Sequence, residues 1–173
     1  MAWYSNLIPD LCVSSCYQLD FATIKAFNCA LLLIDIDNTL VPHDCQLPDA
    51  VAREFLTNLK KQGLEVALIS NNSVKRVKKF ADSVELPFYA SAKKPLTGVY
   101  KKVMKDYQLT NGQLLCIGDQ LLTDVLGAHL AQAKVIWTRP LVGRDIFYTK
   151  INRFFEKLIY RFLVKKGHIS EEV

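Results

Sequence analysis

The sequence lacks the features of a disulfide scaffold, a zinc site or a membrane-spanning chain. Its five cysteines are odd in number and include no CxxC pair, which argues against a disulfide framework or a zinc site and is typical of a reducing compartment. No apolar run approaches the roughly 20 residues that a membrane-spanning helix needs. The N-terminal residues show no basic stretch followed by an apolar one, so we expect no secretory signal and a cytoplasmic location.

Composition and charge narrow the class further. Half of the 173 residues are hydrophobic and 23% are charged, which excludes wholesale disorder and suits one globular domain. The net charge of +5 is concentrated near the C-terminus, because residues 139–166 hold eight Lys or Arg against two acidic residues. No aromatic-basic stacking platform of the kind that binds single-stranded nucleic acid is evident, so we expect no nucleic-acid partner.

Short apolar runs alternate with helical patterns along most of the chain. Buried strands are predicted at 30–36, 64–69 and 114–117, another strand at 135–137, and a short strand or turn at 87–90. Helices are predicted from Pro48 to Gly63 and at 73–83, 96–107, 122–132 and 145–164. Strands that alternate with helices predict an α/β fold in which helices cover both faces of a parallel sheet. Residues 1–28 predict only a short helix, capped by Asp20.

Polar side chains follow three of the predicted strands. Asp35 and Asp37 end the first strand, Ser70 follows the second, and Asp119 and Asp124 follow a later one. In a parallel sheet these strand ends open onto one edge, where ligands bind. Two carboxylates that close together repel unless a cation lies between them or one is protonated. Carboxylates are preferred ligands of Mg2+, and a carboxylate beside the ion can attack phosphorus.

Each of these features has a simpler interpretation when it is taken alone. Asp-Ile-Asp-Asn-Thr can be a polar turn that leaves a strand, since Asp and Asn are common turn residues. Lys94, which precedes Pro95 at the start of a predicted helix, can be a solvated lysine. Four chemically complementary positions that converge on one sheet edge favour a functional site.

These residues match the motifs of the haloacid-dehalogenase-like (HAD) superfamily, which this chain resembles. The motifs stand in the order Asp35-x-Asp37-x-Thr39, Ser70, Lys94-Pro95 and Gly118-Asp119-x-x-x-x-Asp124. Four longer strings are similar to the YqeG-type HAD phosphatases of subfamily IIIA: Asp-Asn-Thr-Leu-Val, Ile-Ser-Asn-Asn, Ala-Lys-Lys-Pro and Gly-Asp-Gln-Leu-Leu-Thr-Asp-Val. The superfamily motifs cover residues 30–138, and the YqeG-like character begins near residue 8.

The resemblance implies a Mg2+-dependent phosphatase that forms an aspartyl-phosphate. Asp35 would be the nucleophile, and Asp37 would be first the general acid and then the general base. The metal ligands would be the Asp35 and Asp119 carboxylates and the Asp37 carbonyl, with Asp124 positioning Lys94 or a metal-bound water.

The same resemblance assigns three residues to the substrate. Ser70 would donate a hydrogen bond to a phosphate oxygen. Asn71 beside it, judged from its residue type alone, is either a loop former or a phosphate contact through its amide. Lys94 would neutralise charge on the phosphate and on Asp35, which makes it a catalytic residue as well. Thr39 would steady the loop that surrounds the substrate.

The spacing of the motifs predicts a single HAD-like domain over residues 1–173, with a core at about 28–140 and no sizeable cap domain. Neither the segment between Asp37 and Pro48 nor that between Ser70 and Lys94 is long enough for a folded cap. Without a cap the site is open, which suits a bulky substrate or one held at a surface.

The basic helix predicted at 145–164 supplies a candidate surface. Its apolar face would hold Phe147, Ile151, Phe154, Phe155, Leu158, Ile159 and Phe162. Its polar face would hold Lys150, Arg153, Glu156, Lys157 and Arg161. This helix either packs on the sheet as the last helix of the fold or makes a peripheral contact with anionic membrane; both interpretations stay open here.

Three functions follow. YqeG-type proteins are similar to phosphatidylglycerophosphate phosphatases, so the resemblance implies a phospholipid phosphate as substrate. The alternative enzyme is an HAD phosphatase for a soluble phosphate ester or a nucleic-acid end. The non-enzymatic alternative is an HAD-fold interaction protein, against which the complete motif set argues.

Overall fold

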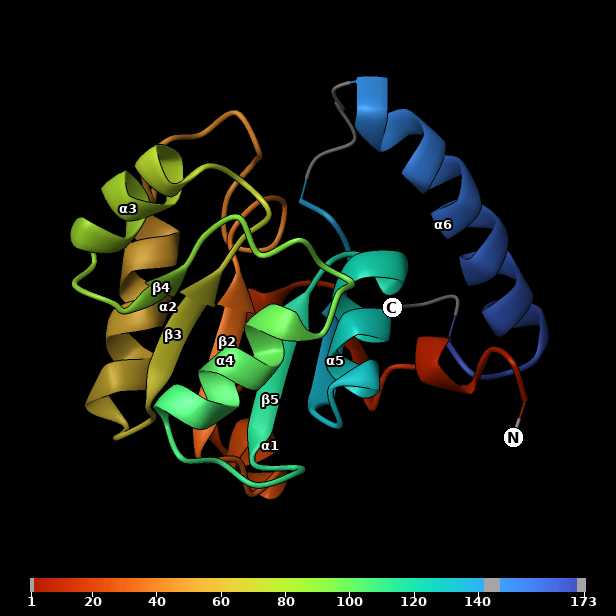
Figure 1. The fold of residues 1–173 in the computed structure, drawn as a ribbon, viewed down its shortest axis with the longest axis horizontal. Helices are drawn as coiled ribbons and strands as arrows, with labels where there is room; N and C mark the ends of the chain where they lie inside the picture. Colours follow the sequence, from red (N-terminus) through yellow and green to blue (C-terminus); the bar gives the residue numbers. More distant parts are fainter. Residues whose placement is uncertain (1, 142–146, 171–173) are drawn as a thin grey trace.

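The computed structural model describes residues 2–141 and 147–170, and for residues 147–153 it describes the backbone alone. A six-stranded sheet forms its centre, in the order β1-β6-β5-β2-β3-β4 (Figure 1). Every neighbouring pair of strands is parallel. The strands are β1 (Leu11–Val13), β2 (Leu31–Asp35), β3 (Val66–Ile69), β4 (Phe88–Tyr89), β5 (Leu114–Gly118) and β6 (Lys134–Thr138).

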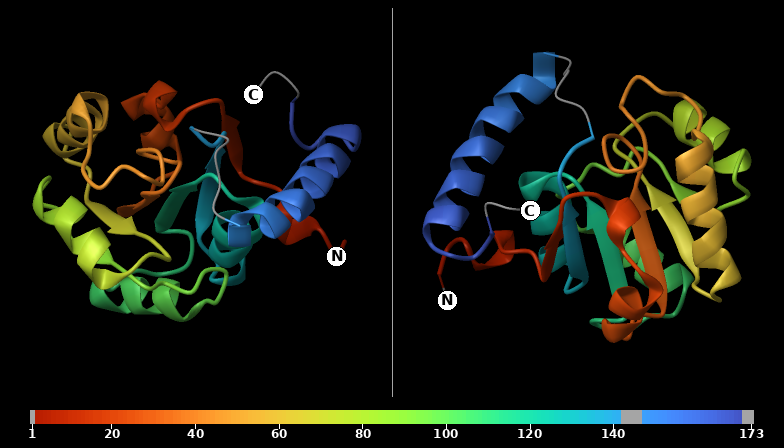
Figure 2. Two further views of the ribbon diagram at one scale, coloured as in Figure 1. Left: turned by 90° about the horizontal axis from the view of Figure 1, so that it is seen from above. Right: turned by 180° about the vertical axis from the view of Figure 1, so that it is seen from behind.

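Helices cover both faces of the sheet, as predicted (Figure 2). On one face pack α1 (Phe21–Ala26), α2 (Ala50–Lys61) and α3 (Val74–Asp82). On the other pack α4 (Gly98–Asp106), α5 (Leu126–Leu130) and α6 (Phe147–Lys165). The structure thus confirms an α/β fold of the HAD-like type, in which residues 36–49 and 70–73 are the connections from β2 to α2 and from β3 to α3.

The central strand β2 shows why its sequence reads as one apolar run. Leu32 and Ile34 contact the helices on one face, and Leu31 and Leu33 contact those on the other. All four side chains are fully buried. A strand that is covered on both faces needs apolar residues at every position, so alternation disappears from its sequence.

The N-terminal residues add an edge strand that the sequence did not predict. β1 pairs with β6, so the sheet begins before residue 28, where the core was expected to start. The predicted Asp20 cap is confirmed, since its carboxylate accepts a hydrogen bond from the backbone N–H of Thr23 at 2.7 Å. Asp10 ties the segment to the sheet by accepting from the N–H of Val135 at 2.7 Å.

The helix predicted at 122–132 is divided in two. Residues Leu121–Val125 form a π-helical turn, and α5 follows directly. The N–H groups of Asp124 and Val125 both bond to the Gln120 carbonyl, at 2.9 and 3.1 Å. Such turns insert one extra residue into a helix and are frequent at functional sites. Here the turn carries Asp124.

Only part of the predicted apolar face of the last helix packs on the protein. Its start at 145–146, and the side chains of Phe147, Lys150, Ile151 and Arg153, lie outside the described residues. Leu163 is fully buried, and Ile159 and Phe162 pack beside it as predicted. Phe154, Phe155 and Leu158, which were assigned to the apolar face, are 62%, 51% and 47% exposed, so this part of the face does not pack on the sheet. Glu156 was assigned to the polar face but bonds to the core.

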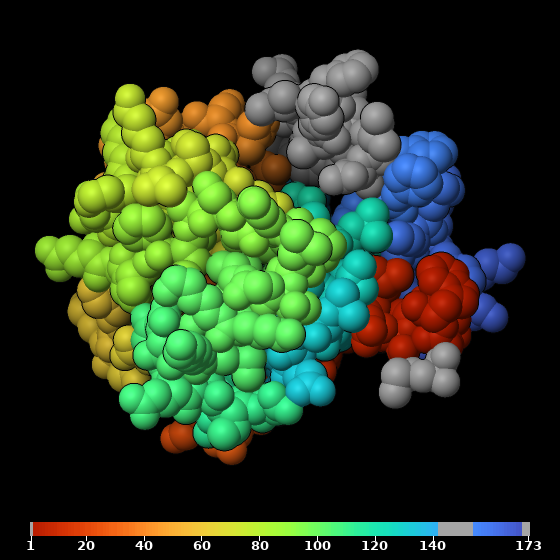
Figure 3. Space-filling model, viewed as in Figure 1, coloured from red at the N-terminus to blue at the C-terminus, as the bar shows by residue number. Residues whose placement is uncertain are grey.

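The C-terminal part of α6 packs on the N-terminal residues, which Figure 3 shows side by side in blue and red. Trp3 and Tyr4 lie against Phe162, with ring centroids 5.8 and 5.1 Å apart. This aromatic contact attaches the C-terminal part of the helix, whereas Phe154 and Phe155 near its start are exposed. None of the described helices is both long enough and apolar enough to cross a membrane.

One glycine determines where the Asp124 turn lies. A Cβ at Gly118, the last residue of β5, would stand 2.3 Å from Cγ of Asp124. Replacing Gly118 by alanine therefore forces the Asp124 side chain to move. We expect Gly118→Ala to lower the free energy of unfolding by about 1–3 kcal/mol, the usual cost of overpacking.

Gly98, at the start of α4, is the matched control, because a Cβ there would meet nothing within 4 Å. Gly98→Ala should leave stability unchanged or raise it by about 0.4–1 kcal/mol, since alanine restricts the unfolded chain. Urea unfolding of both variants makes the comparison. Equal stability of Gly118→Ala and wild type would contradict the close approach.

Candidate functional site

Three buried carboxylates converge at the C-terminal edge of the sheet. Asp35 ends β2, Asp119 follows the neighbouring strand β5, and Asp124 lies in the turn after it. Each has a carboxylate oxygen within 4.8 Å of the others. Because β2 and β5 run in the same direction side by side, residues far apart in sequence meet here.

Lys94 connects two of these carboxylates. Its ammonium donates to Oδ1 of Asp124 at 2.5 Å and also to Oδ1 of Asp35, and its side chain is only 3% exposed. Asn71 holds the backbone of Lys94: the amide oxygen accepts from the Lys94 N–H at 2.7 Å, and the amide nitrogen donates to its carbonyl at 3.3 Å. Asn71, predicted to contact phosphate, thus bonds to the loop that carries Lys94.

The single positive charge of Lys94 cannot balance the two carboxylates to which it bonds, Asp35 and Asp124, when both are ionised. Burial raises the pKa of Asp35 to about 8; the ammonium of Lys94 opposes this shift, and the carboxylates of Asp124 and Asp37 add to it. Burial lowers the pKa of Lys94, but the carboxylates of Asp124 and Asp35 raise it more, so it lies well above its usual value. Lys94 is therefore cationic, and the surplus negative charge favours a proton or a second cation.

A second group of polar side chains lies around Asp37. The hydroxyl of Ser70 donates to Oδ2 of Asp37 at 2.8 Å, and the guanidinium of Arg76 forms an ion pair with Oδ1. Ser70 Oγ also accepts from the N–H of Asn72 at 3.0 Å. These contacts fix the Asp37 carboxylate two residues beyond Asp35, on the loop that leaves β2.

Arg76 is a candidate functional residue that the sequence analysis missed. It stands in the first turn of α3, among lysines that resemble an ordinary solvated face. Its side chain is 16% exposed and pairs with Asp37, which is 20% exposed. A usable signal was its place in the first turn of a helix that begins just after Ser70, because that connection brings the turn to the strand edge.

Thr39 lies behind the Asp37 loop and is fully buried. Its carbonyl accepts a hydrogen bond from the Cys16 thiol at 3.1 Å. Its hydroxyl has no hydrogen-bond partner among residues 2–141 and 147–170. These contacts connect the loop to the N-terminal segment, which places Thr39 where it can support the loop.

The donor set fits a hard divalent cation. Asp35, Asp119 and Asp124 offer carboxylate oxygens, and Mg2+ takes oxygen ligands from one or two carboxylates together with substrate phosphate and water. Two of the three carboxylates already share Lys94, and the raised pKa of Asp35 is the expected mark of a carboxylate whose counter-charge is insufficient. The cluster can therefore bind an ion of this kind.

The histidines take no part in this cluster. Nε2 of His129 lies 3.0 Å from the Asp10 carboxylate, and Nδ1 lies 3.0 Å from the Asn6 carbonyl, so this side chain holds the N-terminal segment. His43 is in the loop between β2 and α2. The two groups that the structure brings together are Asp35, Lys94, Asp119 and Asp124, and Asp37, Ser70 and Arg76.

Several known proteins are similar to this chain in sequence or in fold. A model of haloacid dehalogenase-like hydrolases matches residues 43–138. The chain is 35% identical over 167 residues to the Bacillus subtilis protein named "Probable phosphatase YqeG", covering 95% of this chain and 96% of that one.

Two solved structures share the fold at lower identity. An HAD-superfamily (subfamily III A) hydrolase from Legionella pneumophila has a TM-score of 0.51 at 20% identity, covering 65% of this chain and 66% of that one. The cobalt-bound deoxy-D-mannose-octulosonate 8-phosphate phosphatase from Haemophilus influenzae has a TM-score of 0.53 at 15% identity, covering 79% and 90%. The family model matches more than half of the chain, and the 35% identity to the Bacillus subtilis protein extends over nearly the whole length of both. The chain therefore belongs to the haloacid dehalogenase-like hydrolases, as a phosphatase of the YqeG type.

Proposed function

We propose that this phosphatase hydrolyses a phosphomonoester through an aspartyl-phosphate on Asp35, with Mg2+ as cofactor. The observation that carries the proposal is the buried cluster in which Lys94 bonds to Asp35 and Asp124, with Asp119 alongside. An anionic carboxylate attacks an anionic phosphate only where fixed positive charge offsets their repulsion. Lys94 supplies part of that charge.

The two chemical steps use two carboxylates. In the first, an Asp35 oxygen forms a bond to phosphorus while the bond to the leaving oxygen breaks, and Asp37 gives that oxygen a proton. In the second, Asp37 takes a proton from water as the water oxygen attacks phosphorus, which releases Asp35 and inorganic phosphate. Ser70 and Arg76, which bond to Asp37, hold its carboxylate beside the nucleophile.

The ion would be held by Asp35 and Asp119, with Asp124 nearby, and would supply charge neutralisation at the phosphate. Ser70 and Lys94 would bind the phosphoryl oxygens. Asn71 would act by fixing the Lys94 loop, because the oxygen and the nitrogen of its side-chain amide both bond to the Lys94 backbone. Thr39 would support the Asp37 loop from behind.

We propose that the substrate is phosphatidylglycerophosphate, reached at the inner face of the cytoplasmic membrane. The outward face of α6 supports a peripheral contact, because exposed Phe154, Phe155 and Leu158 stand among exposed Lys157 and Arg161. Aromatic and basic residues on one helix face suit an anionic lipid surface. The short connections from β2 to α2 and from β3 to α3 leave no room for a folded cap between a large headgroup and the site.

The nucleophile is tested by Asp35→Asn. This change removes the attacking oxygen and one metal ligand, so turnover should fall to the background rate. Stability should be equal or higher, because burial disfavours the Asp35 charge and an amide has nearly the same shape. Phosphate release and urea unfolding are the measurements. Hydrolysis at the wild-type rate would exclude the covalent mechanism.

The acid and base role is tested by Asp37→Asn. Loss of a placed proton donor should slow turnover about 100- to 10,000-fold. The second step loses its base as well, so phospho-enzyme should accumulate and be trapped with radiolabelled substrate in acid-quenched samples. Unchanged turnover of Asp37→Asn would exclude Asp37 as the acid and base. Labelling that persists when Asp35→Asn is added would exclude Asp35 as the nucleophile.

Mg2+ binding should depend on pH through Asp35. The ion needs the carboxylate form, and the pKa of Asp35 is raised to about 8. Affinity should therefore rise by about tenfold per pH unit below pH 8 and level off above it, with one proton released per ion. Calorimetry in two buffers of different ionisation enthalpy counts that proton. Equal affinity at pH 6 and pH 8.5 would contradict the assignment.

The lipid substrate is tested with phosphatidylglycerol vesicles. Arg161→Gln together with Phe154→Ser should weaken binding at least about fivefold, because one basic residue near an anionic surface contributes about 1 kcal/mol. Val74→Ser with Lys75→Gln on α3 removes an equally exposed apolar group and one charge, and should bind like wild type.

Activity separates the substrates. The α6 variant should lose activity on phosphatidylglycerophosphate in vesicles and keep it on a soluble phosphate ester. Wild type that binds no vesicles at low salt, or that hydrolyses only soluble esters, would reject the lipid and leave the soluble ester as substrate.

A further inference from the structure

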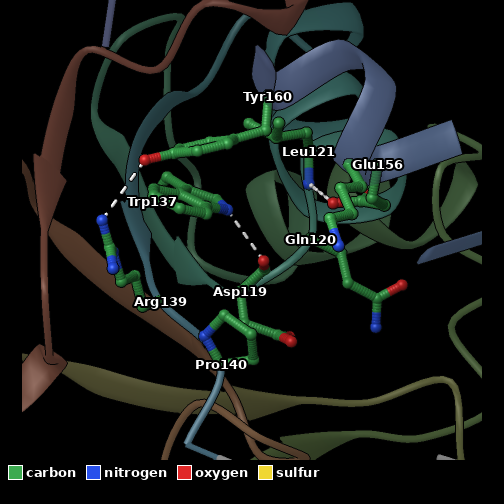
Figure 4. A pocket seen from close by; sticks show the side chains of 9 residues that line it. Asp119, Gln120, Leu121, Trp137, Arg139, Pro140, Glu156 and Tyr160 are labelled. Carbon is green, nitrogen blue, oxygen red and sulfur yellow. Dashed lines mark hydrogen bonds between the residues drawn. The ribbon is translucent and has the colours of Figure 1, made fainter. Parts of the chain in front are cut away.

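A cavity of about 330 Å3 opens between α6 and the C-terminal ends of β5 and β6 (Figure 4). Its walls are mostly apolar. They include Asp119, Trp137, Pro140, Glu156 and Tyr160. Because Asp119 also belongs to the acidic cluster, the cavity adjoins the site where phosphorus would react.

Two aromatic rings form the apolar surface of the cavity. The Trp137 and Tyr160 rings are tilted by 32° with centroids 5.7 Å apart. Figure 4 shows the indole N–H directed at the backbone of Asp119, whose carbonyl accepts it at 2.7 Å. The Tyr160 hydroxyl accepts from Arg139 at 3.3 Å. The Trp137 ring on β6 is thus hydrogen-bonded to the backbone of Asp119, whose carboxylate belongs to the acidic cluster.

The wall that α6 provides is fixed to the catalytic turn. Glu156 accepts hydrogen bonds from the N–H groups of Leu121 at 2.9 Å and Leu122 at 2.6 Å. These N–H groups stand at the start of the helical turn that holds Asp124, where the helix itself offers them no acceptor. A carboxylate at such a helix start is stabilising. The distance from α6 to the acidic cluster is therefore set by a bidentate contact rather than by loose apolar packing.

We propose that this cavity binds the apolar part of the substrate's leaving group, an alkyl or acyl chain, so that α6 takes the place of a cap in selecting the ester. This inference rests on the proposed phosphatase chemistry and not on phosphatidylglycerophosphate as the substrate, because the leaving oxygen of that lipid belongs to a polar glycerol. A phosphate bound at Asp35 and Asp119 places its leaving group outside the acidic cluster, and the aromatic surface beside Asp119 is apolar. A fully polar leaving group gains nothing from such walls, whereas each methylene removed from water is favourable.

A series of linear alkyl phosphates, from methyl to octyl and below their micelle concentrations, tests the subsite. For wild type, kcat/KM should rise about two- to fourfold per methylene until the cavity is filled, as expected for transfer out of water. The readout is the slope along the series, not the rate with any one ester. Tyr160→Ala removes one ring and should flatten the slope, whereas Tyr160→Phe keeps the ring and should keep the slope.

Lys165→Ala is the matched control on α6, because this exposed residue lies in the last turn and outside the cavity. It should retain the wild-type slope. Binding gives a second readout that needs no turnover and remains informative if Tyr160→Ala folds poorly. In a Trp3→Phe background Trp137 is the only tryptophan of the chain. Octylphosphonate should change its emission, and methylphosphonate should not.

The outcomes separate the two proposals. Hydrolysis of every ester with a flat slope, a slope that Tyr160→Ala leaves intact, or emission that does not respond to octylphosphonate would overturn the subsite alone. Absence of hydrolysis of any ester with Mg2+ would overturn the phosphatase chemistry, and octylphosphonate binding at Trp137 would then still support the cavity as an apolar site.

Discussion

The ammonium of Lys94 lies between the buried carboxylates of Asp35 and Asp124, and the positions of three separate segments depend on that contact. An unpaired charge in this environment is costly, so removing Lys94 would leave both carboxylates without compensation. The contact also explains the surrounding geometry: Asn71 fixes the Lys94 backbone, and Gly118 leaves room for Asp124. Since two carboxylates share one ammonium there, the same arrangement that holds the loops together has the charge and the oxygen ligands to bind a metal ion.

The division into fixed and adaptable parts follows from this arrangement. The acidic cluster is buried, and Lys94 bonds to two of its three carboxylates, which suits a reaction common to a whole family. The surfaces that would select a substrate belong instead to α6, which is attached through Glu156 at one point and through Leu163 and Phe162 at its far end. If α6 selects the ester as proposed, changes at Tyr160 would alter which ester is accepted, whereas changes at Glu156 would also disturb the turn that holds Asp124.

The sequence predicted those parts whose signals are local. β2 and β5 are buried on both faces and therefore appear as uninterrupted apolar runs, and their polar ends located Asp35 and Asp119. β1 was missed because three half-buried residues at a sheet edge carry no periodic pattern. Arg76 was missed and Glu156 was placed on a polar face because helical periodicity describes one helix alone. Their partners, Asp37 and the N–H groups of Leu121 and Leu122, lie far away in sequence.

The strand order has a consequence for how the chain folds during synthesis. β1 is made first but pairs only with β6, which is made after the other strands. The first residues must therefore wait, without their sheet partner, until about residue 138 has been made. Contacts between such distant parts of a chain form slowly, because a long loop must close before they contribute. The sheet edge beside β6, where Trp137 and Asp119 meet, is thus completed late, after the central strands have paired.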